Sequence, residues 1–279
     1  MSVNQYIITM KGRHIDIMGI VNITDDSFYS ESRCMDLSAL MAKVKQMVKE
    51  GATILDLGAC SSRPGSEPVG PEVEWERLKP ALLEIRGKYP DMPISIDTCW
   101  SEVVEKAYDY IGDFIVNDIT AGENDPQMLP TVGRLGLTYV AMHMRGDSMT
   151  MQQLTDYDDV VEDVIRYFNE FSEKAAENGI RKWILDPGFG FAKTTSQNYQ
   201  MMRELRKFRK PYAQGIIPQI LVGVSRKSMI YKTFDITPEE SLPQTQVLHL
   251  KALQEGASIL RVHDVAEASR TIEVFWRLC

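Results

Sequence analysis

Short apolar runs alternate with amphipathic stretches along almost the whole chain. Apolar runs of strand length cover residues 17–21, 53–57, 94–96, 114–116, 138–141, 183–185, 220–223 and 258–262. Eight helical patterns lie between and after these runs, the last from about residue 265 to residue 278. Continuous apolar strands that alternate with helices predict a parallel sheet that is buried on both faces.

Eight such units in 279 residues favour an α/β fold with a closed (β/α)8 TIM barrel over an open doubly wound sheet. We therefore predict a single domain, a barrel that extends over residues 1–279. Two candidate strands at the beginning, residues 6–10 and 15–21, predict a short N-terminal β-hairpin. The Gly-x-Gly-x-x-Gly pattern of a dinucleotide-binding fold does not follow the first strand.

A short sequence that occurs twice in the chain supports the repeated helix–strand unit. Residues 50–55 read Glu-Gly-Ala-Thr-Ile-Leu, and residues 255–260 read Glu-Gly-Ala-Ser-Ile-Leu. Gly51 and Gly256 each stand between a helical pattern and an apolar run, which predicts a helix C-terminal cap in the left-handed conformation.

Composition excludes several classes of protein. Hydrophobic residues make up 44% of the chain, yet no apolar run approaches the roughly 18 residues needed to span a bilayer. The first residues lack the features of a signal peptide, so we expect a cytoplasmic protein. Four scattered cysteines indicate neither a disulfide framework nor a zinc site. A net charge of -8 argues against a surface that binds nucleic acid.

Polar residues follow nearly every predicted strand. The carboxyl ends of barrel strands meet at one mouth, where the active sites of such barrels lie. Buried charges that converge there need partners, and a ligand is a natural one. We expect structural roles for Asp56 and Asp118 and a packing role for His143. The strand-end residues are Asn22, Asp56, Asp97, Asn117, Asp118, Met142, His143, Asp186, Ser225, Arg226, Lys227, Ser228, Arg261 and His263.

The segment from Trp183 to Lys193 is the most informative of these ends. Its apolar run stops at Asp186, and a Pro-Gly pair then opens a loop that carries Lys193. Gly188 and Gly190 allow the backbone to approach a flat or anionic ligand closely, because neither has a Cβ. This loop therefore predicts the floor of a pocket.

The strand-end residues divide into two chemistries. The first set offers two carboxylates, an amide and an ammonium, and it comprises Asp97, Asn117, Asp186 and Lys227. These groups suit a planar heterocycle that has a carbonyl and an edge with N–H and amino groups. A second set suits a phosphate or pyrophosphate, and it comprises Asn22, Arg63, Arg261 and His263. The side-chain oxygen of Asn22 is also suited to a hard divalent cation.

The motifs at the strand ends resemble those of the dihydropteroate synthase family over nearly the whole chain. The matching segments are residues 19–28, 56–65, 94–98, 116–119, 142–145, 186–193, 223–228 and 261–264. The resemblance implies a Mg2+-dependent transferase of folate biosynthesis, the target of sulfonamides. Such an enzyme condenses 6-hydroxymethyl-7,8-dihydropterin diphosphate with 4-aminobenzoate to give 7,8-dihydropteroate and pyrophosphate. It also implies a homodimer formed through the last helices.

The resemblance assigns roles to particular residues. It implies catalytic roles for Asp97, Lys227 and Arg261, and a metal contact for Asn22. The pterin would be held by Asp97, Asn117, Met142, Asp186, Phe191, Lys227 and Arg261. The diphosphate would be held by Asn22, Arg63, Arg261 and His263, and the aminobenzoate by Phe28, Ser62, Arg63, Pro64, Lys227 and Ser228.

An arylamine is already a neutral nucleophile at pH 7, so no general base is obligatory. We therefore expect a dissociative, SN1-like substitution in which Asp97 stabilises a cationic pterin methylene and the cations stabilise pyrophosphate. The chain departs from the family pattern at Asp25, where Pro is usual, at residues 29–32, and at Ser62, where Thr is usual. Whether Asp25, Asp26 or Glu31 contacts the metal or the aminobenzoate stays open.

Two rival interpretations remain. A methyltetrahydrofolate methyltransferase domain would share Asp97, Asn117 and Asp186, but it has no need of a diphosphate set. An inactive pterin-binding paralogue would keep the pocket without turnover, and the altered first loop is what favours it. A purely structural protein would not need so many polar strand ends.

Overall fold

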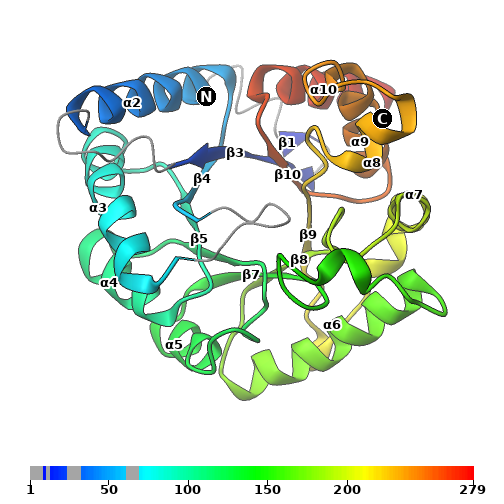
Figure 1. The fold of residues 1–279 in the computed structure, drawn as a ribbon, viewed down its shortest axis with the longest axis horizontal. Coiled ribbons are helices and arrows are strands. Elements are labelled where there is room, and N and C mark those ends of the chain that lie inside the picture. Colours follow the sequence, from blue (N-terminus) through cyan, green and yellow to red (C-terminus); the bar gives the residue numbers. More distant parts are fainter. Residues whose placement is uncertain (1–8, 11–12, 24–32, 61–68) are drawn as a thin grey trace.

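The computed structural model describes residues 9–10, 13–23, 33–60 and 69–279. Within these ranges the fold is a closed barrel of eight parallel strands in the order β10-β3-β4-β5-β6-β7-β8-β9, which confirms the predicted TIM barrel (Figure 1). The predicted extent of this domain, residues 1–279, includes ranges outside the description and stays a prediction. The barrel strands are β3 (Asp16–Asn22), β4 (Ile54–Gly58), β5 (Ile94–Asp97), β6 (Ile115–Asp118), β7 (Thr138–Met142), β8 (Trp183–Asp186), β9 (Gln219–Val222) and β10 (Ile259–Val262).

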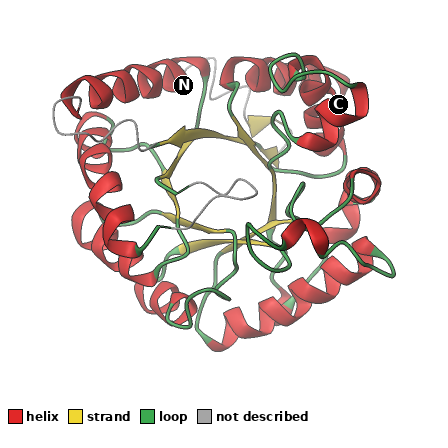
Figure 2. Ribbon diagram, viewed as in Figure 1, coloured by secondary structure: helices red, strands yellow, loops and turns green. Residues whose placement is uncertain are grey.

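Helices form a ring around the barrel, as Figure 2 shows. The described residues form nine α-helices, one more than the pattern predicted. The extra helix arises between β9 and β10, where Asp235 adopts a left-handed φ of 52° and ends the first of two helices. The helices are α2 (Arg33–Glu50), α3 (Pro71–Lys88), α4 (Ser101–Ile111), α5 (Met128–Leu135), α6 (Val160–Glu177), α7 (Thr195–Arg203), α8 (Ser228–Phe234), α9 (Leu242–Gln254) and α10 (Val265–Leu278).

The repeated Glu-Gly-Ala segments end their helices in the same way. Gly51 and Gly256 have φ values of 108° and 109°, so both lie in the positive-φ region that was predicted. The N–H groups of Ala52 and Ala257 each donate, over 2.9 Å, to a carbonyl five residues earlier in the helix. Each chain segment then enters a barrel strand, and the last helix, α10, packs against the first, α2 (Figure 1).

The N-terminal hairpin differs from the prediction in its second strand. β1 (Thr9–Met10) pairs antiparallel with β2 (Arg13–His14), and residues 16–22 instead form the barrel strand β3. β3 pairs in parallel with both β10 and β4, which leaves it no free edge for a hairpin. None of the helices in the described ranges has the length and apolar character needed to cross a membrane.

Two apolar layers make up the core. A small cluster fills the inside of the barrel, and it comprises Met18, Ile54, Val140, Ile184, Leu221 and Ile259, with Ile115 against it. A larger cluster lies between the outer face of the strands and the helices, and Leu55, Leu57 and Val116 belong to it. Neighbouring strand residues thus face opposite layers, which is the period-two alternation of a strand. The closed interior gives the mouth above it a rigid floor.

Candidate functional site

Polar side chains replace apolar ones one step higher inside the barrel. Because residues i and i+2 of a strand share a face, the next inward positions belong to the barrel mouth. They are Asp56, Asn117, Met142, Asp186 and Arg261, which stand two positions after Ile54, Ile115, Val140, Ile184 and Ile259. Five strands therefore deliver the predicted residues to one level, directly above the apolar floor.

Arg261 lies at the centre of this level. Its Nε donates to Asp56 Oδ2 and its terminal Nη2 donates to Asp97 Oδ2, both over 2.7 Å. Asn117 Nδ2 also faces both carboxylate oxygens of Asp56, at 3.3 Å. Asp56 is 0% exposed. Asp56 therefore has the expected structural role, because it orients Arg261 and Asn117.

Asp97 is the more exposed of the two carboxylates that contact Arg261, because 15% of its side chain is accessible compared with 0% for Asp56. Gly58, the next inward position of β4, leaves room for it, because a Cβ there would lie 3.3 Å from the Cβ of Asp97. Burial raises the pKa of Asp97 to about 7, although the Arg261 guanidinium acts in the opposite direction. A bound group that donates hydrogen bonds or carries positive charge would favour the ionised form.

The loop after β8 organises a second group of charges. Asp186, 7% exposed, accepts a hydrogen bond from the Gly188 N–H over 2.8 Å. Lys227 donates to the Phe189 carbonyl, and its ammonium lies 4.4 Å from the centre of the Phe191 ring. Burial lowers the pKa of Lys227 to about 8, with Asp186 opposing this change. Lys227, Phe191 and Asp186 thus share one wall of the mouth.

The remaining described residues of the predicted site lie around this centre. Met142 is buried at the end of β7, and Ser228 is half-buried at the first position of α8. Asn22 is the last residue of β3, and His263 directly follows β10. Both residues are exposed, and their strands are neighbours in the barrel. Phe28, Ser62, Arg63 and Pro64, like the acidic candidates Asp25, Asp26 and Glu31, lie outside the described residues.

Two strand-end residues have structural partners instead. Arg226 pairs with both oxygens of Asp264, over 2.9 and 2.6 Å, and so joins the loops after β9 and β10. Asp118 is buried and accepts hydrogen bonds from Gly122 N, Thr120 and the Tyr139 hydroxyl. The expected structural role of Asp118 is thus what its contacts show.

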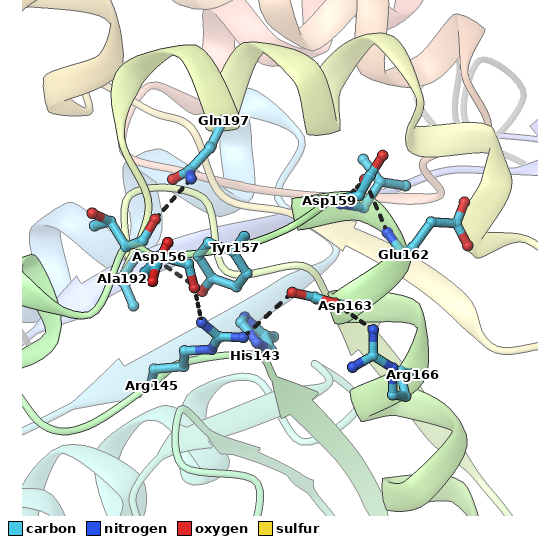
Figure 3. Close-up of polar contacts among 12 residues, drawn as sticks. His143, Arg145, Asp156, Tyr157, Asp159, Glu162, Asp163, Arg166, Ala192 and Gln197 are labelled. Carbon is cyan, nitrogen blue, oxygen red and sulfur yellow. Dashed lines mark hydrogen bonds and ion pairs between the residues drawn. The ribbon is translucent and has the colours of Figure 1, made fainter.

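The loops after β7 and β8 are joined by contacts that the sequence does not indicate. Figure 3 shows Arg145 against the ring of Tyr157, with its guanidinium directed toward Asp163. The guanidinium carbon is 3.8 Å from the ring centre, and the Tyr157 hydroxyl donates to the Ala192 carbonyl over 2.9 Å. The residues involved are far apart in sequence and follow no short motif. Nothing in the local pattern could have paired them.

His143 and Lys193 connect the same two loops in the buried interior. His143 is buried, packs edge-on against Tyr167 and contacts Lys193 Nζ over 2.9 Å through Nδ1. Burial and the neighbouring cations hold the pKa of His143 well below its usual range. This agrees with the packing role expected for His143. The sequence places Lys193 in this loop but does not indicate that its side chain points inward.

The chain is similar to proteins of known class over most of its length. The family model described as pterin binding enzyme matches residues 18–263. The dihydropteroate synthase of Escherichia coli is 37% identical over 263 residues, which cover 94% of this chain and 90% of that protein. The folic acid synthesis protein fol1 of Schizosaccharomyces pombe is 38% identical over 260 residues, and the chain spans about a third (35%) of its length.

Solved structures agree with the sequence matches. Xanthomonas albilineans dihydropteroate synthase with 4-aminobenzoic acid superposes with a TM-score of 0.83 at 35% identity, covering 95% of this chain and 93% of that one. The Clostridium difficile enzyme, crystallised in the presence of pteroic acid, gives 0.86 at 32% identity, covering 97% and 99%. Together with the family match, these likenesses show that the chain belongs to the dihydropteroate synthase family of pterin-binding enzymes.

Proposed function

We propose that the chain is a transferase that condenses 6-hydroxymethyl-7,8-dihydropterin diphosphate with 4-aminobenzoate, giving 7,8-dihydropteroate and pyrophosphate. The observation that carries the proposal is the single cluster formed by Asp97, Asn117, Asp186, Lys227 and Arg261 above the barrel floor. Relatives named dihydropteroate synthase support it. So does the Burkholderia cenocepacia dihydropteroate synthase, whose solved structure is a complex with 7,8-dihydropteroate.

The pterin fits the polar groups of this cluster. Asp186 keeps one carboxylate oxygen occupied by the Gly188 N–H, and the ionised group can still accept from the N–H and amino edge of a pterin. Lys227 can donate to the pterin carbonyl, while Asn117 is already oriented by Asp56. Met142 and Phe191 offer apolar surface to the flat ring.

The chemistry follows from the charges around Asp97. The bond between the pterin methylene and the diphosphate oxygen breaks, the electron pair leaves with pyrophosphate, and the arylamine nitrogen then attacks the cationic methylene. That nitrogen loses its proton after the new bond forms. Asp97 stabilises the cation, and Arg261, with His263 and Arg63, stabilises the leaving group. Fixed charges of this kind are often the largest catalytic contribution.

Magnesium fits the residues on the diphosphate side. Mg2+ keeps several waters and is held by one or two protein oxygens together with substrate phosphates, so it needs few protein ligands. Among the described residues no group of three His, Cys, Asp or Glu side chains could hold a metal, whereas the exposed amide of Asn22 offers an oxygen. When bound, Mg2+ would neutralise charge on the departing pyrophosphate.

The aminobenzoate would lie beside Lys227 and Ser228, with Phe28, Ser62, Arg63 and Pro64 contributing from ranges outside the described residues. The proposed location is the cytoplasm, in line with the four scattered cysteines. Neither a nucleic acid nor a membrane is a proposed partner. Fractionation of cells that express the tagged chain tests the location.

A homodimer through α9 and α10 is the proposed assembly. These helices expose Val247, Val274 and Leu278, which are 67%, 50% and 64% exposed. Val247→Glu should shift the protein from dimer to monomer in sedimentation velocity, because burying a carboxylate in an apolar interface is costly. Val73→Glu on α3 is the matched control and should leave the dimer intact. A wild-type monomer would contradict the assembly.

Turnover tests the proposed reaction. Purified protein is incubated with dihydropterin diphosphate and Mg2+, with and without 4-aminobenzoate, and dihydropteroate is measured by chromatography. We expect product only when both substrates are present, and less product when a sulfonamide competes with 4-aminobenzoate. Tight pterin binding without product would identify an inactive paralogue. Absence of pterin binding would overturn the assignment of Asp97, Asn117 and Asp186.

A further inference from the structure

Lys193 is a buried lysine outside the proposed substrate contacts. It is 4% exposed, and its ammonium is enclosed by backbone and imidazole acceptors. Nζ lies 3.1 Å from the Gly188 carbonyl, 3.0 Å from the Phe191 carbonyl and 2.9 Å from His143 Nδ1. A longer contact of 3.4 Å reaches the carbonyl of His143. Within the described parts of the chain, Lys193 forms no ion pair with a carboxylate.

These contacts match the three protons of an ammonium group. The carbonyls of Gly188 and Phe191 can only accept, and each takes one N–H. His143 is held neutral by its burial, so its Nδ1 can accept the third. Burial lowers the pKa of Lys193 well below its usual range, with Asp186 acting in the opposite direction, whereas the three acceptors around Nζ favour the protonated form. Such a group connects the end of β7 with both ends of the loop after β8.

The same loop carries the contacts that hold the substrate-binding charges. Between the two carbonyls bound by Lys193, the Phe189 carbonyl accepts from Lys227, and the Phe191 ring lies under the Lys227 ammonium. The Gly188 N–H points to Asp186. The ammonium of Lys193 therefore fixes one face of a loop whose other face positions Asp186 and Lys227.

The loop needs this support because its backbone is unusual. Gly188, Gly190 and Ala192 have φ values of 71°, 83° and 49°, so three alternate residues lie in the left-handed region. For Ala192 this conformation costs on the order of 1 kcal/mol. Such backbone persists only where several contacts hold it. Lys193 holds the inner side, and the Tyr157 hydroxyl binds the Ala192 carbonyl on the outer side (Figure 3).

We propose that Lys193 is a positioning residue for the reaction, whose ammonium shapes the loop of residues 187–192 and supplies fixed positive charge behind Asp186. The proposal rests on the proposed function, because it concerns the binding of the pterin substrate. Burial raises the pKa of Asp186, while Lys227, Arg261 and Lys193 act against this rise. Loss of the Lys193 charge would thus leave less Asp186 ionised at a given pH.

Two variants separate charge from hydrogen bonding. Lys193→Met keeps the length of the side chain without its charge or donors, and Lys193→Gln keeps two N–H donors without the charge. Tyr157→Phe is the matched control, since it removes one hydrogen bond from the outer side of the same loop. Circular dichroism and thermal midpoints establish which variants are folded. Pterin diphosphate affinity, both KM values and the pH profile of kcat/KM are then measured.

We expect Lys193→Met to weaken pterin diphosphate binding at least tenfold while the KM for 4-aminobenzoate changes less than threefold. In both Lys193 variants the acid limb of kcat/KM for the pterin should move to higher pH by at least half a unit. Tyr157→Phe should weaken binding less than threefold and leave the limb in place. If Lys193→Met does not fold, Lys193→Gln supplies the same two readouts.

Three results would overturn the inference: wild-type pterin affinity in a folded Lys193 variant, an unmoved acid limb in both Lys193 variants, or an equal effect of Tyr157→Phe. Calorimetric binding of the pterin diphosphate keeps this test separate from the proposed function. If the wild-type protein binds no pterin, the proposed function fails. If it binds pterin and the Lys193 variants bind it equally well, the inference alone fails.

Discussion

Glu74 carries a carboxyl group that the fold buries. It lies in the first turn of α3, is 1% exposed, and its Oε1 has no hydrogen-bond partner among the described residues. Burial raises the pKa of Glu74 from 4.5 to about 7, although a hydrogen bond with Thr98 and the charge of Arg77 act against this. At pH 8 the protein therefore buries an ionised carboxylate, and one of its oxygens lacks a hydrogen-bond partner among the described residues.

The free energy of unfolding should reflect this burial. A carboxyl group whose pKa is higher in the folded state binds its proton more tightly there, so its contribution to stability is lost as pH rises from about 4.5 to 7. At about 1.4 kcal/mol per pKa unit, the loss amounts to roughly 3 kcal/mol. Glu74→Gln removes the charge and keeps the shape. It should stabilise the protein by about 2–3 kcal/mol at pH 8 and by less than about 0.5 kcal/mol at pH 4.5.

Calorimetric or urea-unfolding curves of both proteins between pH 4.5 and pH 9 measure this difference. Comparing the two proteins at each pH cancels the contributions of the other titrating groups, as long as those groups titrate alike in both. The expected signature is a gap that opens with rising pH and reaches a plateau above about pH 7.5. Parallel curves, or a variant less stable at pH 8, would refute the reasoning about Glu74.

Three further predictions concern the mouth of the barrel. Lys227→Met should lower kcat/KM for the pterin diphosphate about a hundredfold. In the wild type, kcat/KM should correspondingly fall as pH rises through about 8, because Lys227 loses its charge there. Steady-state kinetics at several pH values measure both effects. Asp56→Asn should destabilise the protein by about 3 kcal/mol in urea unfolding, because Arg261 loses a buried partner. Gly188→Ala would place a carbon 2.0 Å from the His143 carbonyl oxygen at a φ of 71°, and calorimetric titration should show loss of pterin binding. Unchanged kinetics, stability or binding, respectively, would contradict each one.

Much of the fold was predictable because it rests on local regularities. Continuous apolar strands followed by Gly-capped helices recur along the chain, and a parallel barrel buries all of these strands. The strand ends could be assigned to one mouth for the same reason, before any distance was known. The prediction of the hairpin's second strand was wrong because residues 16–22 satisfy the apolar pattern of a hairpin strand and of a barrel strand equally well.

The partners inside the site could not be predicted in the same way. Asp56 and Arg261 are 205 residues apart, and only closure of the barrel makes them an ion pair. Lys193 illustrates a different limit. A lysine after a glycine-rich loop is expected at the surface or on a ligand, and its inward direction depends on three left-handed residues and on His143. Such conformations follow from tertiary contacts that no sequence spacing specifies.

We propose that the residues gathered at the barrel mouth bind the pterin diphosphate and transfer its pterinylmethyl group to an arylamine. The most direct test follows dihydropteroate and pyrophosphate together, in the wild type and in Asp186→Asn, with Asp147→Asn on the exposed β7–α6 loop as control. We expect equal amounts of both products from the wild type and the control, and a loss of at least a hundredfold in kcat/KM for Asp186→Asn. Undiminished turnover by Asp186→Asn would contradict this expectation, and so would pyrophosphate formed without an equal amount of dihydropteroate when 4-aminobenzoate is in excess.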